Sequence, residues 1–213
     1  MPGIRKTSVR TALLTVPLVV SVLSAVAVPA GAAAHPARSL TCRGEGVDPK
    51  ARVRYRTEVM IHAPLKTVWK VQTDVERWPS WQAPVKTSER LDHHGSLRKG
   101  SAFRWTTPVP ATPVTPETTL VITSTVRQLK HGSCIRWTGP AIGEGIRIDG
   151  VHVWNFVKVE GGVLVRTEET HTGELVDANV DYATEILGQG LEAWLRALKK
   201  TAEASAGAHP TDH

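Results

Sequence analysis

The chain has 213 residues, two cysteines and a formal net charge of +6. Arg5, Lys6 and Arg10 lie near the N-terminus, where no acidic residue offsets them, so the remainder is nearer +3. This excess of positive charge is mild, and the basic residues form no cluster of the kind that binds nucleic acids. We therefore expect no DNA or RNA partner.

The N-terminal segment has the pattern of a secretory signal peptide. Its basic residues precede an apolar run, 12–30, and small residues follow. Cleavage after Ala32 or after Ala34 fits this pattern. A transmembrane anchor is the alternative, but Pro17 interrupts the run and no stop-transfer charges flank it. We therefore predict that residues 1–34 are removed, leaving a secreted or extracytoplasmic protein with no stable membrane anchor.

The two cysteines are expected to form one disulfide. Cys42 lies in a short leader, residues 35–51, that shows no periodicity and is expected to be irregular. Cys134 begins an expected strand. In an exported protein an even pair of cysteines is most simply one bridge, Cys42–Cys134; two unpaired thiols are the alternative.

Apolar and polar residues alternate in seven segments, which predicts seven strands. They occupy residues 52–63, 85–93, 100–107, 118–129, 134–138, 150–159 and 163–173. Pro64 is expected to open a helix over 65–74, and a shorter helical turn follows within 74–81. Four prolines between Pro108 and Pro116 predict an exposed linker. The glycine-rich segment 139–145 predicts a flexible loop.

The last two strands are expected to form a hairpin, because Glu160-Gly161-Gly162 is a turn signal. His152, Trp154 and Phe156 share one face of the first strand, and Glu169 lies across the turn on the second. A plain core does not need a histidine and a glutamate, whereas a concave pocket with a few placed polar groups does. A structural polar pair that fixes the strand register is the alternative.

The final segment, 179–204, is expected to be a long amphipathic helix, with Ile186, Leu187, Leu191, Trp194, Leu195 and Leu198 on one face. Gly188 and Gly190 are unusual within a helix. They are expected either to let a strand approach closely or to leave room for a ligand. The polar tail 205–213 is expected to be disordered, which leaves one domain over residues 52–204.

Several stretches together carry a family resemblance: IHAPLKTVWKVQTDVERWPSW, LRKGSAFRW, IRWTG, VHVWNF, VRTEETHTG and LEAWLRALKKTAEA. In this order they resemble the START/Bet v 1-like (SRPBCC) superfamily, specifically its polyketide cyclase/dehydrase and lipid-transport group. The resemblance implies an α+β helix-grip fold. In it a seven-stranded antiparallel sheet curves around the long C-terminal helix, with two short helices after the first strand and a cavity between sheet and helix. It also implies apolar or amphipathic ligands, and it does not imply catalysis.

The residues that share the expected inner face are the candidate ligand-binding residues: Phe103, Trp105, Trp137, His152, Trp154, Phe156, Glu169, Leu187, Leu191 and Trp194. For any one tryptophan, core packing is the simpler role. Trp154 and Trp194 are expected to face each other between sheet and helix, with the Trp154 ring only partly packed.

No catalytic motif, cofactor site or metal site is apparent, and His93-His94 lacks a third ligand at metal spacing. The sequence thus predicts a secreted, monomeric binding or carrier protein for a small hydrophobic or amphipathic ligand. One alternative is an aromatase/cyclase-type enzyme in which His152 or Glu169 moves a proton. Another is an interaction module that uses the proline-rich loop 108–116.

Overall fold

The computed structural model describes residues 38–92, 95–113 and 115–207. The predicted signal peptide (1–34), the His93-His94 pair and the end of the polar tail lie outside the described residues. Within the described ranges, no helix is long and apolar enough to cross a membrane.

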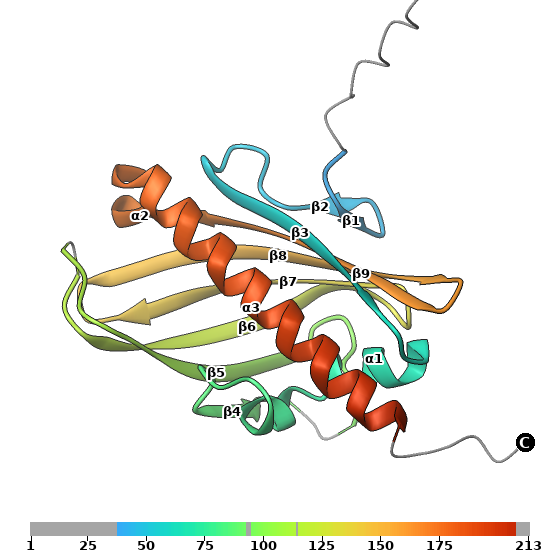
Figure 1. Cartoon of the computed structure of the whole chain (residues 1–213). Helices are drawn as coiled ribbons and strands as arrows, with labels where there is room; N and C mark the ends of the chain where they lie inside the picture. The colour runs from blue at the N-terminus through green and yellow to red at the C-terminus, as the bar shows by residue number, and fades with distance from the viewer. Residues whose placement is uncertain (1–37, 93–94, 114, 208–213) are drawn as a thin grey trace, which may run out of the picture. The chain divides into compact units, whose positions relative to one another are not determined.

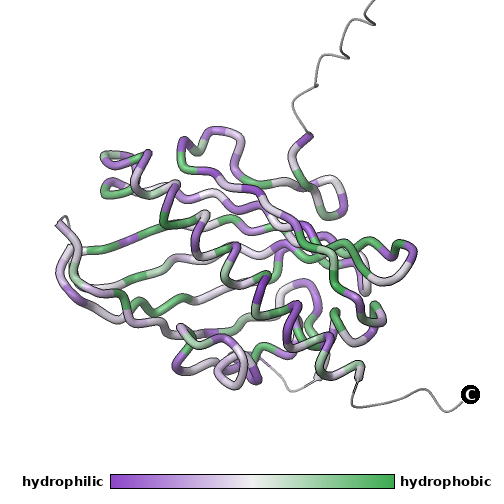
Figure 2. The backbone as a smooth tube through the Cα atoms, in the orientation of Figure 1, coloured by the Kyte–Doolittle hydropathy of each residue, from purple (hydrophilic) through white to green (hydrophobic). Residues whose placement is uncertain are grey.

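Seven antiparallel strands form one sheet in the order β3-β9-β8-β7-β6-β5-β4, and the last two strands form the expected hairpin. In Figure 2 apolar and polar residues alternate along most of these strands, as they do when one face of a sheet is buried. The strands are β3 (Val53–Ile61), β4 (Thr87–Arg90), β5 (Ala102–Val109), β6 (Thr118–Lys130), β7 (Cys134–Gly143), β8 (Ile146–Val159) and β9 (Gly162–Thr172).

Helix α3 (Val180–Gly207) lies across one face of this sheet, called here the inner face (Figure 1). Two short helices, α1 (Leu65–Thr73) and the 3₁₀ helix η1 (Val75–Ser80), follow β3, and α2 (Glu174–Ala178) precedes α3. The predicted helix-grip fold is confirmed. The final helix continues past its expected end at residue 204.

The glycine-rich segment 139–145, expected to be a loop, mostly continues a strand. Residues Gly139–Gly143 belong to β7, and only Glu144 and Gly145 form the turn to β8. Glycine is needed at 139 because a Cβ there would lie 2.1 Å from the carbonyl oxygen of Thr123 on β6. The glycine thus marks a close approach of two strands rather than flexibility.

The proline-rich segment differs from the expectation at its start, because Pro108 and Val109 extend β5. Pro108 pairs with Thr119 of β6, while β4 reaches only to Thr106 on the other side. Pro108 therefore lies at an edge of the sheet without a neighbouring strand on one side. Its lack of a backbone N–H costs no hydrogen bond there.

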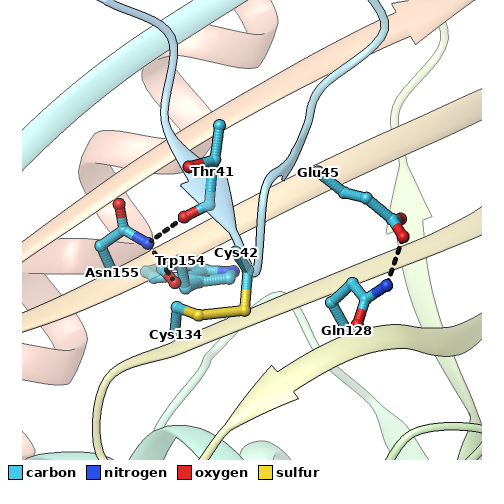
Figure 3. Close-up of a disulfide and its surroundings, with 7 residues drawn as sticks. All are labelled: Thr41, Cys42, Glu45, Gln128, Cys134, Trp154 and Asn155. Carbon is cyan, nitrogen blue, oxygen red and sulfur yellow. Dashed lines mark hydrogen bonds between the residues drawn. A yellow bond between two sulfur atoms is a disulfide. The ribbon is translucent and has the colours of Figure 1, made fainter.

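The leader contains a small hairpin, β1 (Thr41–Cys42) and β2 (Glu45–Gly46), where an irregular segment was expected. It packs on the outer face of the sheet, against Val151 and Val153. The predicted disulfide Cys42–Cys134 joins it to β7, with Cα atoms 5.4 Å apart (Figure 3).

Polar contacts fix the leader on both sides of the disulfide. Asn155 donates to the Thr41 carbonyl, and Gln128 donates to the Glu45 carboxylate (Figure 3). Glu168 of β9 is buried beneath the leader, where it accepts hydrogen bonds from the Ser39 hydroxyl and the Leu40 backbone N–H. Arg54 of β3 pairs with the same carboxylate at 2.8 Å. The leader is therefore a bonded part of the outer face.

Candidate functional site

The inner face of the sheet divides into two halves along the strands. In one half the inward side chains of the sheet form a solid core with the C-terminal half of α3. The sheet contributes Phe103, Val126, Ile135, Phe156 and Val165, and α3 contributes Leu195 and Leu198. Trp69 of α1 closes this half, with its ring centroid 5.1 Å from that of Phe156. All of these side chains are buried, so this half is the packed end of the domain.

The other half of the inner face bounds a cavity of about 480 Å³. Every second residue of β8 from Ile146 to Trp154 lines it, and the lining of β8 ends at Trp154. Across the cavity, α3 contributes Tyr182, Ala183, Ile186, Leu187, Gly190, Leu191, Ala193 and Trp194. The volume lies within the range of small-molecule sites, about 300–1,000 Å³.

Part of the cavity lining is exposed to solvent at the N-terminal half of α3 and at the β5–β6 connection. Pro110, Thr112 and Thr115 line it on the connection side. Tyr182 and Ile186 line it on the helix side, although 42% and 48% of their surfaces are exposed. A large apolar side chain that is half exposed and also lines a cavity is typical of the rim of a binding site.

Five tryptophans form much of the wall: Trp78, Trp105, Trp137, Trp154 and Trp194. The Trp78 and Trp194 rings meet edge to face, with centroids 4.9 Å apart, and Trp154 lies 6.4 Å from Trp194. The indole N–H groups of Trp78 and Trp194 donate to the backbone and side-chain oxygens of Gln72, each at 3.0 Å. Edge-to-face packing and these hydrogen bonds hold the rings in place.

A chain of polar side chains interrupts the apolar wall. The β8–β9 register places His152 directly opposite Glu169, and the His152 Nδ1 atom lies 3.1 Å from a Glu169 oxygen. The second Glu169 oxygen lies 3.2 Å from Nε2 of His171. On the far side of the His152 ring, Nε2 lies 2.6 Å from the Thr167 hydroxyl.

Gly150 borders this polar chain. It pairs with His171 on β9 and lines the cavity. A Cβ at position 150 would stand 3.4 Å from a Glu169 oxygen and 3.7 Å from the His171 ring, which are ordinary van der Waals distances. The glycine therefore leaves the carboxylate and the second imidazole uncovered by a side chain of β8 at this layer of the wall.

The protonation states follow from burial and from these contacts. Burial lowers the pKa of His152 to about 4, and the Glu169 carboxylate offsets only part of that shift. Burial alone would raise the pKa of Glu169, but the contacts with His152 and His171 outweigh it, so the net shift is downward. At neutral pH the site thus holds a carboxylate beside a neutral imidazole. His152 Nδ1–H donates to Glu169, and Nε2 accepts from the Thr167 hydroxyl.

Both ring nitrogens of His152 are engaged by side chains of β9. A general base works best with a pKa near the working pH, and the pKa of His152 lies well below 7. No cluster of three or more potential metal ligands occurs among the described residues.

Eight of the ten candidate ligand-binding residues line the cavity: Trp105, Trp137, His152, Trp154, Glu169, Leu187, Leu191 and Trp194. Phe103 and Phe156 lie instead in the solid half, where they pack against other aromatic rings. The Trp154 ring, expected to be partly packed, has no exposed surface.

His171 and Tyr182 line the cavity but were not among the candidates. Both could have been found from the sequence pattern. His171 lies two residues after Glu169 on the same strand, and Tyr182 lies four residues before Ile186 on the same helix, so each shares the inward face of its neighbour.

Solved structures share this architecture. The di-domain ARO/CYC StfQ from the steffimycin biosynthetic pathway superimposes with a TM-score of 0.57 at 17% identity, covering 73% of this chain and 52% of that protein. The hypothetical protein jhp0584 from Helicobacter pylori gives 0.57 at 18% identity, covering 72% and 90%. A START superfamily protein from Mycobacterium smegmatis gives 0.53 at 15% identity, covering 73% and 97%. At these identities the likeness shows the fold.

No curated protein matches the chain. A sequence profile of the family described as polyketide cyclase/dehydrase and lipid transport, however, matches residues 52–203. That match spans every strand of the large sheet and nearly all of α3. The chain therefore belongs to the polyketide cyclase/dehydrase and lipid transport family.

Proposed function

We propose that this protein is an exported, non-catalytic carrier that holds one small lipophilic or amphipathic ligand between its sheet and α3. The observation that carries the proposal is the 480 Å³ cavity, walled by tryptophans and carrying the His152–Glu169–His171 chain among a few other polar side chains. An apolar volume with a few placed polar groups is the usual form of a small-molecule site.

Native mass spectrometry tests this proposal directly. Protein recovered from the culture medium and incubated with a lipid extract of the same cells is expected to retain one small molecule per chain. Ile148→Trp fills the cavity from β8, and this variant is expected to lose the adduct. Val157→Trp is the matched control, because Val157 lies on the same strand, is 40% exposed and does not line the cavity. Absence of any adduct in the native protein, or equal retention by both variants, would refute the carrier proposal.

Export is part of the same proposal. Three features support it: the signal-like segment 1–34, the Cys42–Cys134 bridge and the bonded leader. Disulfides persist in oxidising compartments, so a leader that is bridged to the sheet suits an extracytoplasmic protein. N-terminal sequencing of the medium fraction is expected to begin at Ala33 or His35. Material that begins at Met1 would contradict the signal peptide.

The mature protein is then expected to be a monomer in which the leader, 35–51, is followed by the ligand-binding domain, 52–204. Size-exclusion chromatography with light scattering of the secreted protein measures this. A dimer at micromolar concentration would contradict it.

An aromatase/cyclase-type activity is the second candidate, because the His152–Glu169–His171 chain lies within the cavity and could contact a bound polyketone. The lowered pKa values of His152 and Glu169 count against this activity. His152→Ala and Glu169→Gln distinguish the two functions. An enzyme that uses these groups changes its product profile with a polyketone substrate, whereas an unchanged profile would exclude this mechanism.

A further inference from the structure

One carboxylate lies on the wall of the cavity. Among the described residues that line the cavity, Glu169 is the sole aspartate, glutamate, lysine or arginine. Burial raises the pKa of Glu169, but the contacts with His152 and His171 outweigh burial, so the carboxylate is charged at neutral pH. A charge in a mostly apolar site is costly unless a charge of the opposite sign compensates it.

The bonded partners of this carboxylate are imidazoles rather than permanent cations. His152 Nδ1 lies 3.1 Å from one oxygen, and His171 Nε2 lies 3.2 Å from the other. The cross-strand neighbour on the other side, Tyr55 of β3, donates its hydroxyl to Glu192 instead. A carboxylate offers about four lone pairs, so Glu169 keeps the capacity to accept further hydrogen bonds and to pair with a cation.

The carboxylate is open to the cavity beside Gly150. The Glu169 side chain is 18% exposed and lines the cavity. Gly150 lies between Ile148 and His152 on β8, and all three line the cavity from the same face of the strand. A Cβ at position 150 would enter the cavity on that face, 3.4 Å from a Glu169 oxygen. Because position 150 has no side chain, a molecule in the cavity can reach that oxygen.

The helical side of the cavity carries negative charge as well. Residues 174–195, which form α2 and the first half of α3, include five acidic residues and no lysine or arginine. Arg52 donates to the Asp177 carbonyl oxygen. Arg196 pairs with Glu192. These two cations offset only part of the negative charge. A field of one sign beside an exposed part of a cavity raises the local concentration of molecules of the opposite charge.

We propose that the ligand is a lipophilic amine, bound as its ammonium ion with an N–H donated to the Glu169 carboxylate. This inference rests on the carrier function proposed above and narrows its ligand class. An ammonium ion compensates the charge of Glu169, which a neutral alcohol does not. The tryptophan rings that form much of the wall also attract cations through their faces. An anionic ligand meets a like charge in a site of low dielectric, so fatty acids are disfavoured.

Three naphthalene derivatives of similar size test the proposal: naphthylethylamine, naphthylethanol and naphthylacetate. Their affinities for the full-length secreted protein are measured at pH 8 by displacement of the fluorescent probe Nile red. The amine is expected to bind about tenfold more tightly than the alcohol, because its hydrogen bond to the carboxylate is strengthened by its own charge. Naphthylacetate is expected to bind more weakly than both.

Glu169→Gln removes the charge and keeps the shape of the side chain. This variant is expected to reduce the preference for the amine over the alcohol to about one and to relieve the rejection of naphthylacetate. Glu58→Gln is the matched control, because Glu58 pairs with Arg166, does not line the cavity and removes the same charge from the neighbouring strand β3. The control is expected to keep the preference for the amine.

The outcomes separate this inference from the carrier function. If the alcohol or naphthylacetate binds as tightly as the amine, if the amine preference survives in Glu169→Gln, or if Glu58→Gln loses it equally, the amine inference is overturned and the carrier function stands. Should Glu169→Gln fail to fold, the three affinities of the native protein still decide. If no probe displaces Nile red and no cellular lipid is retained, the carrier function and the inference fail together.

Discussion

Gly190 gives the sharpest test of where the ligand lies. It lines the cavity from α3, and among the described residues no heavy atom beyond its own stretch of helix lies within 4 Å of the position that a Cβ would take. Gly190→Ala is therefore expected to raise the free energy of unfolding by about 1 kcal/mol, the helix-propensity difference between the two residues. Gly190→Leu is expected to keep most of that gain while its side chain enters the cavity.

A ligand that shares the cavity with the new leucine incurs an overpacking cost of about 1–3 kcal/mol. The affinity for the fluorescent probe Nile red is therefore expected to fall roughly five- to 150-fold in a protein that is more stable than the native one. Urea denaturation and probe titration measure the two effects separately. Unchanged probe affinity in Gly190→Leu would show that the ligand site has been placed in the wrong part of the molecule.

Gly188, one half-turn earlier in the same helix, is the matched control. It does not line the cavity, and a Cβ there would lie 2.7 Å from the Tyr55 ring of β3. The Tyr55 hydroxyl is bonded to Glu192, which limits how far the ring can move. Gly188→Ala is therefore expected to lower the free energy of unfolding, because an overpacking cost near the top of the range of about 1–3 kcal/mol exceeds the propensity gain. A stabilised Gly188→Ala would refute the close approach of β3 and α3.

Three further predictions concern stability. The free energy of unfolding is expected to fall by about 3 kcal/mol between pH 7 and pH 4, because His152 has a pKa of about 4 when folded and roughly 6.5 when unfolded, so the unfolded chain takes up its proton first. His152→Gln should remove this part of the slope in urea denaturation across pH, and an unaltered slope would contradict the assignment. Reduction of Cys42–Cys134, which are separated by 92 positions, is expected to cost about 2–5 kcal/mol, and equal denaturation midpoints with and without reductant would show that the bridge contributes nothing. Trp69→Ala is expected to cost about 3–5 kcal/mol and to leave probe affinity unchanged, because Trp69 packs on Phe156 outside the cavity; weakened probe binding in the folded variant would argue against the two-half division.

The contact between His152 and Glu169 could be predicted because it depends on local signals. Alternation fixes the face of each strand, and the turn at Glu160-Gly161-Gly162 fixes which residues lie opposite each other. The observed register through Val159 and Gly162 brings the two side chains together.

The boundary between solid core and cavity could not be predicted in this way. Phe103 and Phe156 alternate correctly onto the inner face, yet both lie beyond the inner end of the cavity. Alternation reports which face a side chain occupies and contains no information on its position along the strand relative to α3. That position depends on how the helix crosses the sheet, which is a property of the assembled domain.

The two helix glycines illustrate the same limit. The sequence favoured either a close strand approach or space for a ligand, and each explanation holds for one glycine: Gly188 contacts Tyr55, and Gly190 faces open space. Both have the same local propensity cost. Only the long-range meeting of β3 with α3 distinguishes them.

Glu168 and Glu169 are consecutive residues of β9 that face opposite sides of the sheet. Glu168 binds the leader on the outer face, and Glu169 belongs to the polar chain on the inner face. Because neighbouring strand residues face opposite sides, the insertion or deletion of one residue between Gly162 and Glu168 would move each of them to the other face. An insertion would bring Glu168 to the inner place of Glu169 and Thr167 to the outer place of Glu168, so the leader would lose its carboxylate anchor. A deletion would bring Glu169 to the outer place and Thr170 to the inner place, so the cavity would lose its carboxylate. A change in strand length therefore removes one of the two attachments whichever way it goes, because a single pair of adjacent glutamates supplies both.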